Sequence, residues 1–413
     1  MRWLKPLSAL ALVTTLAGCE SIFGSGNEEP ITRLPRALTQ SEQDLIVASN
    51  RFGFNLLREV SARDTSSNVF LSPLSASMAL GMTMNGARGE TFTGMRSTLG
   101  FGTMEPAEIN ASYRSLIDLL LGLDGNVDMR LANSIWVDQQ FPLHPAFVES
   151  SLQHFDARVT ALDFGNPASV NTINGWVDQG TNGKIKQIVE GIDAGVVMYL
   201  INAVYFKGSW TQEFDPARTS PAPFHRADGG QHPVQMMFMR DAKVRTVMND
   251  QVQMVDLAYG RGAFSMTLVL PPHGQPLRQW AAGVTDEKWQ GWIAQLRDTE
   301  MDVSLPRFRL EYDEVLNNTL MALGMGTAFH QVAADFSGMS PLGADLFITN
   351  VKQKTFIDVN EKGTEAAAAT SVEMGVTSAP PSFRADRPFL VAIRERHSGT
   401  ILFVGLIGDP RSQ

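Results

Sequence analysis

DVNEKGTEAAAAT, residues 358–370, begins the most informative stretch of the chain. From Thr364 to Val376 every second residue is uncharged, and this set becomes more apolar along the chain, whereas the residues between them carry the acids. Such alternation is typical of a strand with one buried face and one solvated face. The first proline after it is Pro380, so every amide before that point could join a sheet. An alanine-rich linker in a surface loop explains the composition equally well, and both interpretations stay open at this point.

The composition argues against several classes of function. The chain has 413 residues, a formal net charge of −9 and no run of basic residues. Nucleic acid is therefore a poor partner, because phosphate binding needs clustered lysine and arginine. The single cysteine, Cys19, allows no internal disulfide and no cysteine-based metal site, and the seven histidines are scattered. We expect no metal and no cofactor.

The start of the chain resembles a bacterial export signal. Arg2 and Lys5 supply positive charge, and a short apolar run follows that is too short to span a bilayer. The run ends in Leu16-Ala17-Gly18-Cys19, which resembles the lipobox at which lipoproteins are cleaved and acylated on cysteine. The alternative is a plain secretory signal with a cysteine at this place by chance.

These features divide the chain into three parts. Residues 1–18 are interpreted as a lipoprotein signal peptide, residues 19–40 as a lipidated flexible tether, and residues 41–413 as one domain. We expect the protein in the cell envelope, anchored to a membrane through Cys19. Glu20 stands where an inner-membrane retention signal would show aspartate, which favours the outer membrane, on its periplasmic or surface face.

Apolar periodicity predicts an α+β domain. Apolar residues recur at helical spacing from Ser41 to Val60, and a second, apolar helix is expected over residues 75–85. Runs of strand length follow, mostly late in the chain, at residues 131–137, 199–206, 264–270, 301–308, 346–359, 389–393 and 401–406. Helices that cluster early and strands that cluster late favour α+β over a regular βαβ fold.

Motifs for catalysis are missing from the sequence. The chain contains no Gly-x-Ser-x-Gly elbow, no phosphate-binding loop and no dinucleotide fingerprint. Sequence patterns leave open a triad assembled from distant residues, but nothing points to one. The protein is therefore not expected to be an enzyme.

Residues 361–369 resemble the proximal hinge of inhibitory serpins almost letter for letter. Further segments are similar to other signatures of that family: residues 68–75, 86–91, 171–184, 202–210, 386–389 and 399–405. The resemblance implies a fold of three β-sheets and about nine helices with an exposed reactive loop. It also implies a monomer that traps a target protease covalently, because the cleaved loop inserts into the central sheet before the acyl-enzyme is hydrolysed.

The resemblance assigns roles to residues of the loop. The hinge comprises Glu361, Gly363, Thr364, Glu365, Ala366, Ala367, Ala368 and Ala369. Family spacing, counted from Glu361 and from Pro388, places the reactive bond at Thr377-Ser378, and cleavage after Val376 is the competing register. A small β-branched residue there suits elastase-like or subtilisin-like proteases, and Val376 could also suit papain-like enzymes. The alternative is a non-inhibitory serpin that acts as a binding module.

The resemblance also assigns residues beneath the central sheet. The shutter, the region that opens during insertion, is matched by Ser72, Ser75, Asn202 and Gln353, and the breach, where insertion begins, is matched by Trp210. Simple core packing would explain the same residues. Family members commonly carry histidine where this chain has Gln353, which can still donate and accept hydrogen bonds but cannot titrate.

Overall fold

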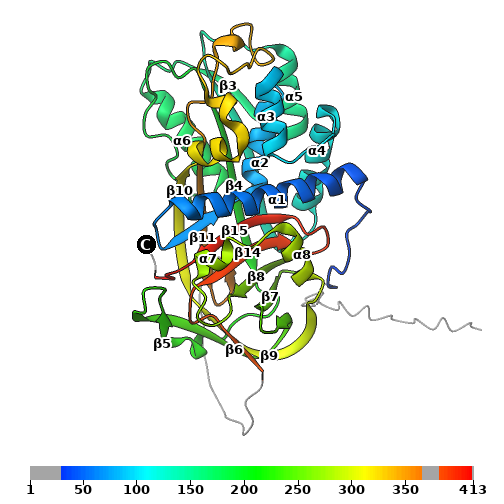
Figure 1. Ribbon diagram of the computed structural model, residues 1–413, viewed down its shortest axis with the longest axis vertical. Helices are drawn as coiled ribbons and strands as arrows, with labels where there is room; N and C mark the ends of the chain where they lie inside the picture. Colours follow the sequence, from blue (N-terminus) through cyan, green and yellow to red (C-terminus); the bar gives the residue numbers. More distant parts are fainter. Residues whose placement is uncertain (1–28, 365–380, 412–413) are drawn as a thin grey trace, which may run out of the picture.

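The computed structural model describes residues 29–364 and 381–411 (Figure 1). Within these ranges the chain forms nine α-helices: α1 Gln40–Arg63, α2 Pro73–Met84, α3 Gly89–Thr98, α4 Pro106–Gly122, α5 Pro145–Phe155, α6 Ala168–Gly180, α7 Leu277–Ala281, α8 Asp286–Ile293 and α9 Asn317–Leu320. The long helices precede most of the strands in sequence. The α+β class expected from the sequence is confirmed.

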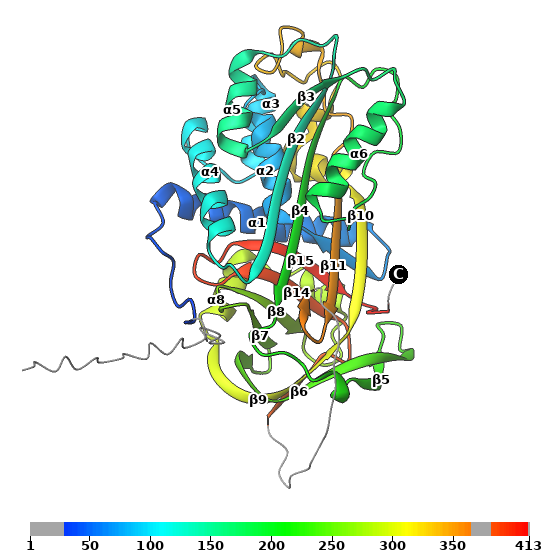
Figure 2. The ribbon, with the colours of Figure 1, turned by 180° about the vertical axis from the view of Figure 1, so that it is seen from behind.

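One sheet of six strands runs along the long axis of the molecule (Figure 2). Its strands lie in the order β10 Phe308–Val315, β11 Lys352–Asn360, β12 Gly363–Thr364, β4 Met198–Ser209, β2 Val127–Asp138 and β3 Arg158–Leu162. Neighbours are antiparallel except for β2 and β3, which are parallel. α6 packs on one face through Ile173 and Val177, whereas α2 lies against the other face (Figure 2).

Local sequence signals explain where the first two helices begin. α1 starts with a capping box: Thr39 accepts from the backbone N–H of Glu42, whose carboxylate accepts from the N–H of Thr39. α2 begins at Pro73, whose fixed φ suits a first helical turn, and nearly all of α2 is buried. Both helices confirm the sequence prediction. The buried α2 supports the middle of the six-stranded sheet.

A second sheet of nine strands packs below α1. Its order is β1 Asn68–Leu71, β15 Ile401–Ile407, β14 Phe389–Glu395, β8 Phe264–Leu270, β7 Gln253–Tyr259, β6 Gln231–Met248, β9 Arg297–Pro306 and β13 Ser382–Arg384, with β5 Ser220–His225 paired to β6. The resemblance implied three sheets, whereas the strands of the described residues are connected by hydrogen bonds into two. The register of β6 shifts between Met239 and Ala242, with a φ of 50° at Asp241. This bulge leaves Arg240 and Asp241 out of the ladder, and pairing with β9 resumes at Ala242.

Part of the expected tether lies against the domain. The N–H of Ile31 donates to the carbonyl of Arg261 at 2.8 Å. Arg36 forms two hydrogen bonds with the buried carboxylate of Glu42, at 2.6 and 2.8 Å. Within the expected tether, Ile31 and Arg36 therefore lie against the domain, whereas residues 19–28 lie outside the described residues. Cys19 lies outside the described residues.

The strand predicted over residues 346–359 is shorter in the structure. β11 begins at Lys352, and the preceding backbone is held by loops: the N–H of Ile348 donates to Ala328 O at 2.9 Å, and the N–H of Val351 donates to Asn317 Oδ1 at 2.8 Å. An apolar run cannot distinguish a strand from a buried loop. The other strand predictions are confirmed to within a few residues.

Candidate functional site

The hinge segment enters the six-stranded sheet between β11 and β4. Gly363 and Thr364, which form β12, pair with both neighbours, and Thr364 lies opposite Gly208 on β4 and Val359 on β11. No other strand of the described chain lies between β11 and β4. The two long strands are thus separated at one end by a strand of only two residues.

Gly363 has no room for a side chain. Its φ is +146°, a conformation that L-residues rarely adopt, and an added Cβ would lie 2.1 Å from the carbonyl oxygen of Gly208. Glycine is therefore required where the chain turns into the sheet.

An aromatic pair lies beside β12. We call the region between β11 and β4 the gap, and the end of it that β12 enters its mouth. Trp210 stacks on Tyr259 with ring centroids 4.4 Å apart and an interplanar angle of 10°. Trp210 Nε1 donates to the carbonyl of Asn360 at 2.9 Å, and the hydroxyls of Tyr259 and Thr364 are hydrogen-bonded at 2.8 Å. Burial raises the pKa of Tyr259, so its hydroxyl stays protonated. The backbone N–H of Trp210, the predicted breach residue, also donates to the carbonyl of Lys362, between Glu361 and Gly363, at 2.8 Å.

Glu361 is anchored by two side chains. The Thr219 hydroxyl donates to its carboxylate at 2.6 Å, and Arg307 forms an ion pair with it. Burial alone would raise the pKa of Glu361, but the hydrogen bonds from Thr219 and Arg307 outweigh burial and hold this pKa below its usual range. The N–H of Phe214 donates to the backbone carbonyl of Glu361 at 2.8 Å. The first residue of the hinge is therefore fixed to the domain.

Gln353 is satisfied by the backbone at the start of α2. Its side-chain oxygen accepts from the N–H of Ser72 at 3.0 Å, and its side-chain nitrogen donates to the carbonyl of Ser72 at 2.9 Å. The Ser72 hydroxyl donates to Leu402 O at 2.7 Å. These bonds tie β11 to α2 and to the second sheet.

A chain of side-chain hydrogen bonds ties β4 to its other neighbours. The Ser75 hydroxyl donates to Asn202 Oδ1, and Asn202 Nδ2 donates to Asn133 Oδ1 on β2. Ser75 and Asn133 are buried. Two polar side chains therefore flank the middle of the gap, Gln353 on β11 and Asn202 on β4. Each of them already has hydrogen-bond partners.

The structure places the described site residues in two groups. Glu361, Gly363, Thr364 and Trp210 meet at the mouth of the gap, and Ser72, Ser75, Asn202 and Gln353 lie beneath its middle. The remaining predicted residues lie outside the described residues: Cys19, Glu365, Ala366, Ala367, Ala368, Ala369, Thr377 and Ser378.

Sequence reasoning missed three partners of the hinge, namely Tyr259, Thr219 and Arg307. Each lies at least 54 residues away in the chain from the hinge residue it contacts. No periodicity or motif marks them, because Tyr259 at the end of β7, Thr219 before β5 and Arg307 after β9 meet the hinge only when the two sheets assemble.

Metal-binding clusters and membrane-spanning helices are absent from the described residues. Residues 29–364 and 381–411 contain no group of histidine, cysteine, aspartate or glutamate arranged to hold a metal ion. None of the helices in these ranges is long and apolar enough to cross a membrane.

The hinge segment thus begins a short strand between β11 and β4 at one end of the six-stranded sheet. Residues 47–410 match the family model described as "Serpin (serine protease inhibitor)". The chain belongs to the serpin family.

The similarity to known proteins extends over nearly the whole length of the chain. Human Serpin B9 is 36% identical over 373 residues, which cover 88% of this chain and 98% of the relative. Human leukocyte elastase inhibitor is 34% identical over 382 residues, 89% of this chain and 100% of the relative. The solved structure of tengpin, a thermophilic serpin in its native state, has a TM-score of 0.82 at 29% identity and covers 92% of this chain and 97% of its own. These relatives support protease inhibition in general.

Proposed function

We propose that this serpin is a suicide-substrate inhibitor that acts as a monomer on serine proteases. The position of β12 carries the proposal, because two residues of the loop's start already lie between β4 and β11. The alternating pattern runs from Thr364 to Val376, and no proline interrupts the chain before Pro380. Each further residue that entered the gap would find hydrogen-bonding strands on both sides.

In the proposed reaction the protease attacks the loop as it would a substrate. Its serine oxygen bonds to the carbonyl carbon of Thr377, and its histidine takes the serine proton and passes it to the departing amine of Ser378. An ester then joins the protease to Thr377. Insertion of the loop competes with hydrolysis of this ester, and inhibition requires that insertion is faster.

The target class follows from the residues around this bond. Thr377 is small and β-branched, so it suits the shallow apolar pocket of elastase-like or subtilisin-like proteases rather than a pocket built for arginine or lysine. Leukocyte elastase inhibitor is among the relatives, which supports this class. Val376, the residue before Thr377, suits the second subsite of papain-like proteases, so the proposal extends to that class.

Mixing with pancreatic elastase tests the proposal. We expect a covalent complex that survives SDS and a released peptide that begins at Ser378; a peptide that begins at Thr377 would move the bond to Val376-Thr377. Ala368→Arg should yield cleaved protein in place of complex, because Ala368 belongs to the buried set. Ala367→Arg is the matched control, since it alters the solvated set and should keep the complex. Clean cleavage of the wild-type protein without complex would favour a non-inhibitory binding serpin.

We also propose that acylated Cys19 anchors the domain to a membrane, and that this membrane is the outer membrane. The lipobox-like residues 16–19 support this proposal, and several acyl chains on one site would anchor stably where one chain would not. Cys19→Ala should move the protein from the membrane fraction to the soluble fraction and leave complex formation unchanged. Equal membrane retention of the variant would contradict the anchor.

A further inference from the structure

Residues 29–37 form an arch that is tied to the domain at both ends. At the first end the carbonyl of Ile31 accepts from Nε2 of His397 at 3.0 Å. At the other end Arg36 forms the two hydrogen bonds with Glu42 described above. Beneath the arch lies a hollow of about 1110 Å³, which we call the basic hollow.

Four parts of the chain line the basic hollow. They are the arch itself, the end of α4, and the turns that follow β7 and β14. Every ionisable side chain in this lining is basic: Arg33, Arg36, Arg261, Arg396 and His397. The whole chain carries a formal charge of −9, so this gathering of positive charge is contrary to the average of the sequence.

The acidic partners of these residues are buried behind the lining. Four carboxylates pair with arginines or hold the turns, and each is at most 3% exposed: Glu42, Asp124, Asp256 and Glu395. Asp256 serves two guanidinium groups, since Arg394 lies 2.9 Å and Arg396 3.2 Å from its carboxylate. Arg33 is exposed and forms no ion pair within residues 29–364 and 381–411. The surface of the hollow therefore carries an excess of positive charge.

Guanidinium groups that line one hollow are suited to a phosphate. Each presents a planar fork of N–H donors that matches phosphate oxygens, and each stays charged at physiological pH. A phosphomonoester carries about −1.5 to −2 charges and three acceptor oxygens at pH 7, so it can engage several forks at once. Burial lowers the pKa of Arg396, and a bound anion would compensate the charge of this desolvated cation.

Apolar side chains lie next to the arginines. The same lining includes Ile31, Leu34, Pro35 and Leu123, and both leucines are half-buried. Inorganic phosphate would leave this apolar surface in water. A lipid headgroup carries glycerol and acyl carbons beside its phosphate, and these would cover it. The lining therefore favours a lipid over a free ion.

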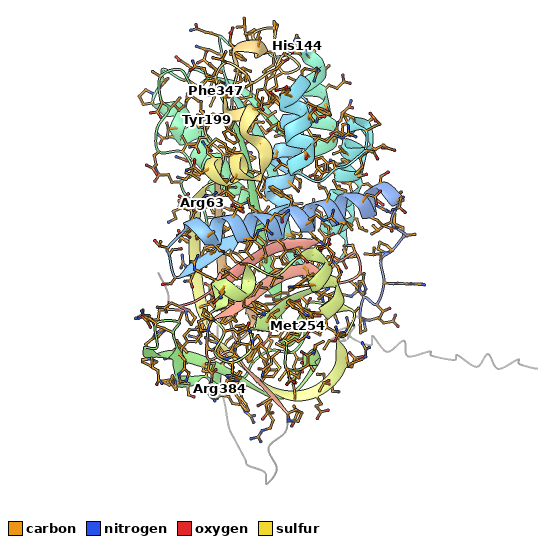
Figure 3. The ribbon with its side chains drawn as sticks, in the orientation of Figure 1. Arg63, His144, Tyr199, Met254, Phe347 and Arg384 are labelled. Atoms are coloured by element: carbon orange, nitrogen blue, oxygen red, sulfur yellow. The ribbon has the colours of Figure 1, made fainter. Side chains whose placement is uncertain are left out.

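The basic hollow lies close to the proposed lipid anchor. Cys19 precedes Glu29, the first residue of the arch, by ten residues, which span at most roughly 36 Å. The arch runs along one side of the molecule to the start of α1 (Figures 1 and 2). Arg63 at the far end of α1 lies on the opposite side, and Arg384 in β13 lies toward one end (Figure 3). A membrane at the arch would leave the end that carries β13 accessible.

We propose that the basic hollow binds the phosphomonoester headgroup of a lipid in the membrane to which Cys19 is anchored. The proposal rests on the proposed anchor for the source of the phosphate and is independent of protease inhibition. The acyl chains would keep the protein at the membrane, so headgroup binding becomes a local event of high effective concentration. It would fix which side of the domain faces the membrane.

Vesicle binding by the unacylated Cys19→Ala protein tests the site apart from the anchor. We expect sedimentation with vesicles of phosphatidylcholine that contain phosphatidic acid, and none with phosphatidylcholine alone. Phosphatidylserine vesicles of equal charge should bind much less protein, because their phosphate is a diester. General attraction to an anionic surface does not explain such binding, since the protein is acidic overall. Binding to phosphatidic acid that does not exceed binding to phosphatidylserine would overturn the proposal.

A pair of charge reversals in the Cys19→Ala protein locates the site. Arg33→Glu should weaken binding to phosphatidic acid roughly tenfold or more, because each basic residue near an anionic surface contributes about a factor of five. The fold should be unaffected, since Arg33 is exposed. Arg63→Glu is the matched control on the opposite side and should bind like its parent. Equal loss in both variants, or loss in neither, would refute the site at the arch.

Inorganic phosphate distinguishes the two sources of the ligand. If it raises the melting temperature of the Cys19→Ala protein while phosphatidic acid vesicles do not bind, the lipid is refuted as the ligand. The fractionation of Cys19→Ala described above tests the anchor separately. Vesicle binding that depends on Arg33 would uphold the site even if that fractionation contradicts the anchor.

Discussion

At Gly363 the backbone passes so close to β4 that a methyl group cannot be placed there. We expect Gly363→Ala to lower the free energy of unfolding by ~1–3 kcal/mol, because alanine is strained at this φ and would contact the Gly208 carbonyl. Urea unfolding of the intact protein measures the change. Gly125→Ala is the control, since a Cβ at Gly125 meets no atom within 4 Å. Equal losses in both variants would contradict the role of Gly363.

Gln353 closes the sheet over α2 with two hydrogen bonds to the backbone of Ser72. Replacing it by alanine leaves a buried N–H and C=O without these partners, so Gln353→Ala should lower the free energy of unfolding by ~1–3 kcal/mol. The exposed Gln187→Ala serves as the control. Urea midpoints that do not differ between the two variants would show that this contact is dispensable.

Glutamine at this position also has a consequence for pH. The family resemblance implies histidine at this position, and histidine titrates near neutral pH, whereas glutamine does not titrate. Opening of this sheet should therefore lack the pH dependence that a titrating shutter residue would give. Gln353→His introduces a titratable group at this position for direct comparison.

Among the elements, the segment of residues 29–37 forms an N-terminal strap across the ends of α1 and α4. Arg36 hydrogen-bonds to Glu42 in the first turn of α1 and to the hydroxyl of Ser115 in α4. The hydrogen bond from Arg36 is the main cause that lowers the pKa of Glu42 to about 2 from its ordinary value of 4.5. The strap therefore stabilises α1 through a carboxylate that stays ionised.

The sign of the pH dependence follows from this lowered pKa. The contribution of Glu42 is fully present above pH 4.5 and is lost as the pH falls toward 2. Arg36→Ala should cost ~1–3 kcal/mol at pH 7, because the buried carboxylate loses its charged partner. The difference from the wild-type protein should shrink as the pH falls below about 4.5. Unfolding free energies across pH measure it, with Arg33→Ala as the control; a difference independent of pH would contradict the linkage.

The sequence predicted elements best where one local pattern determined them. The run at residues 264–270 coincides with β8, and the capped start of α1 lies one residue from its predicted place. The strand at 346–359 was predicted too long, because the apolar residues Leu346, Phe347, Ile348 and Val351 line a cavity before β11 begins at Lys352. Tyr259 and Arg307 were missed because their contacts with the hinge depend on tertiary assembly.

On the scale of the whole molecule, three features lie along one line. β12 enters the six-stranded sheet at one end, and the contacts of Ser75 and Gln353 lie beneath its middle. A cavity of about 300 Å³, lined by Met198, Leu200, Phe347 and Val351 among others, lies at the other end. The native sheet thus has a gap with hydrogen-bonding strands on both sides and unfilled apolar volume at its far end. A strand from the loop would pair with β4 and β11 and would fill the apolar volume. The intact protein is therefore expected to be less stable than its inserted form.

Cutting a surface loop ordinarily adds no stability, since it only frees the chain. The melting temperature of the intact protein, compared with that of the same protein cleaved by elastase, therefore tests loop insertion most directly. We predict that the cleaved protein melts at a markedly higher temperature than the intact one, and that Ala368→Arg shows a smaller increase. A cleaved wild-type protein that melts at or below the temperature of the intact form would contradict insertion and, with it, the proposed mechanism of inhibition.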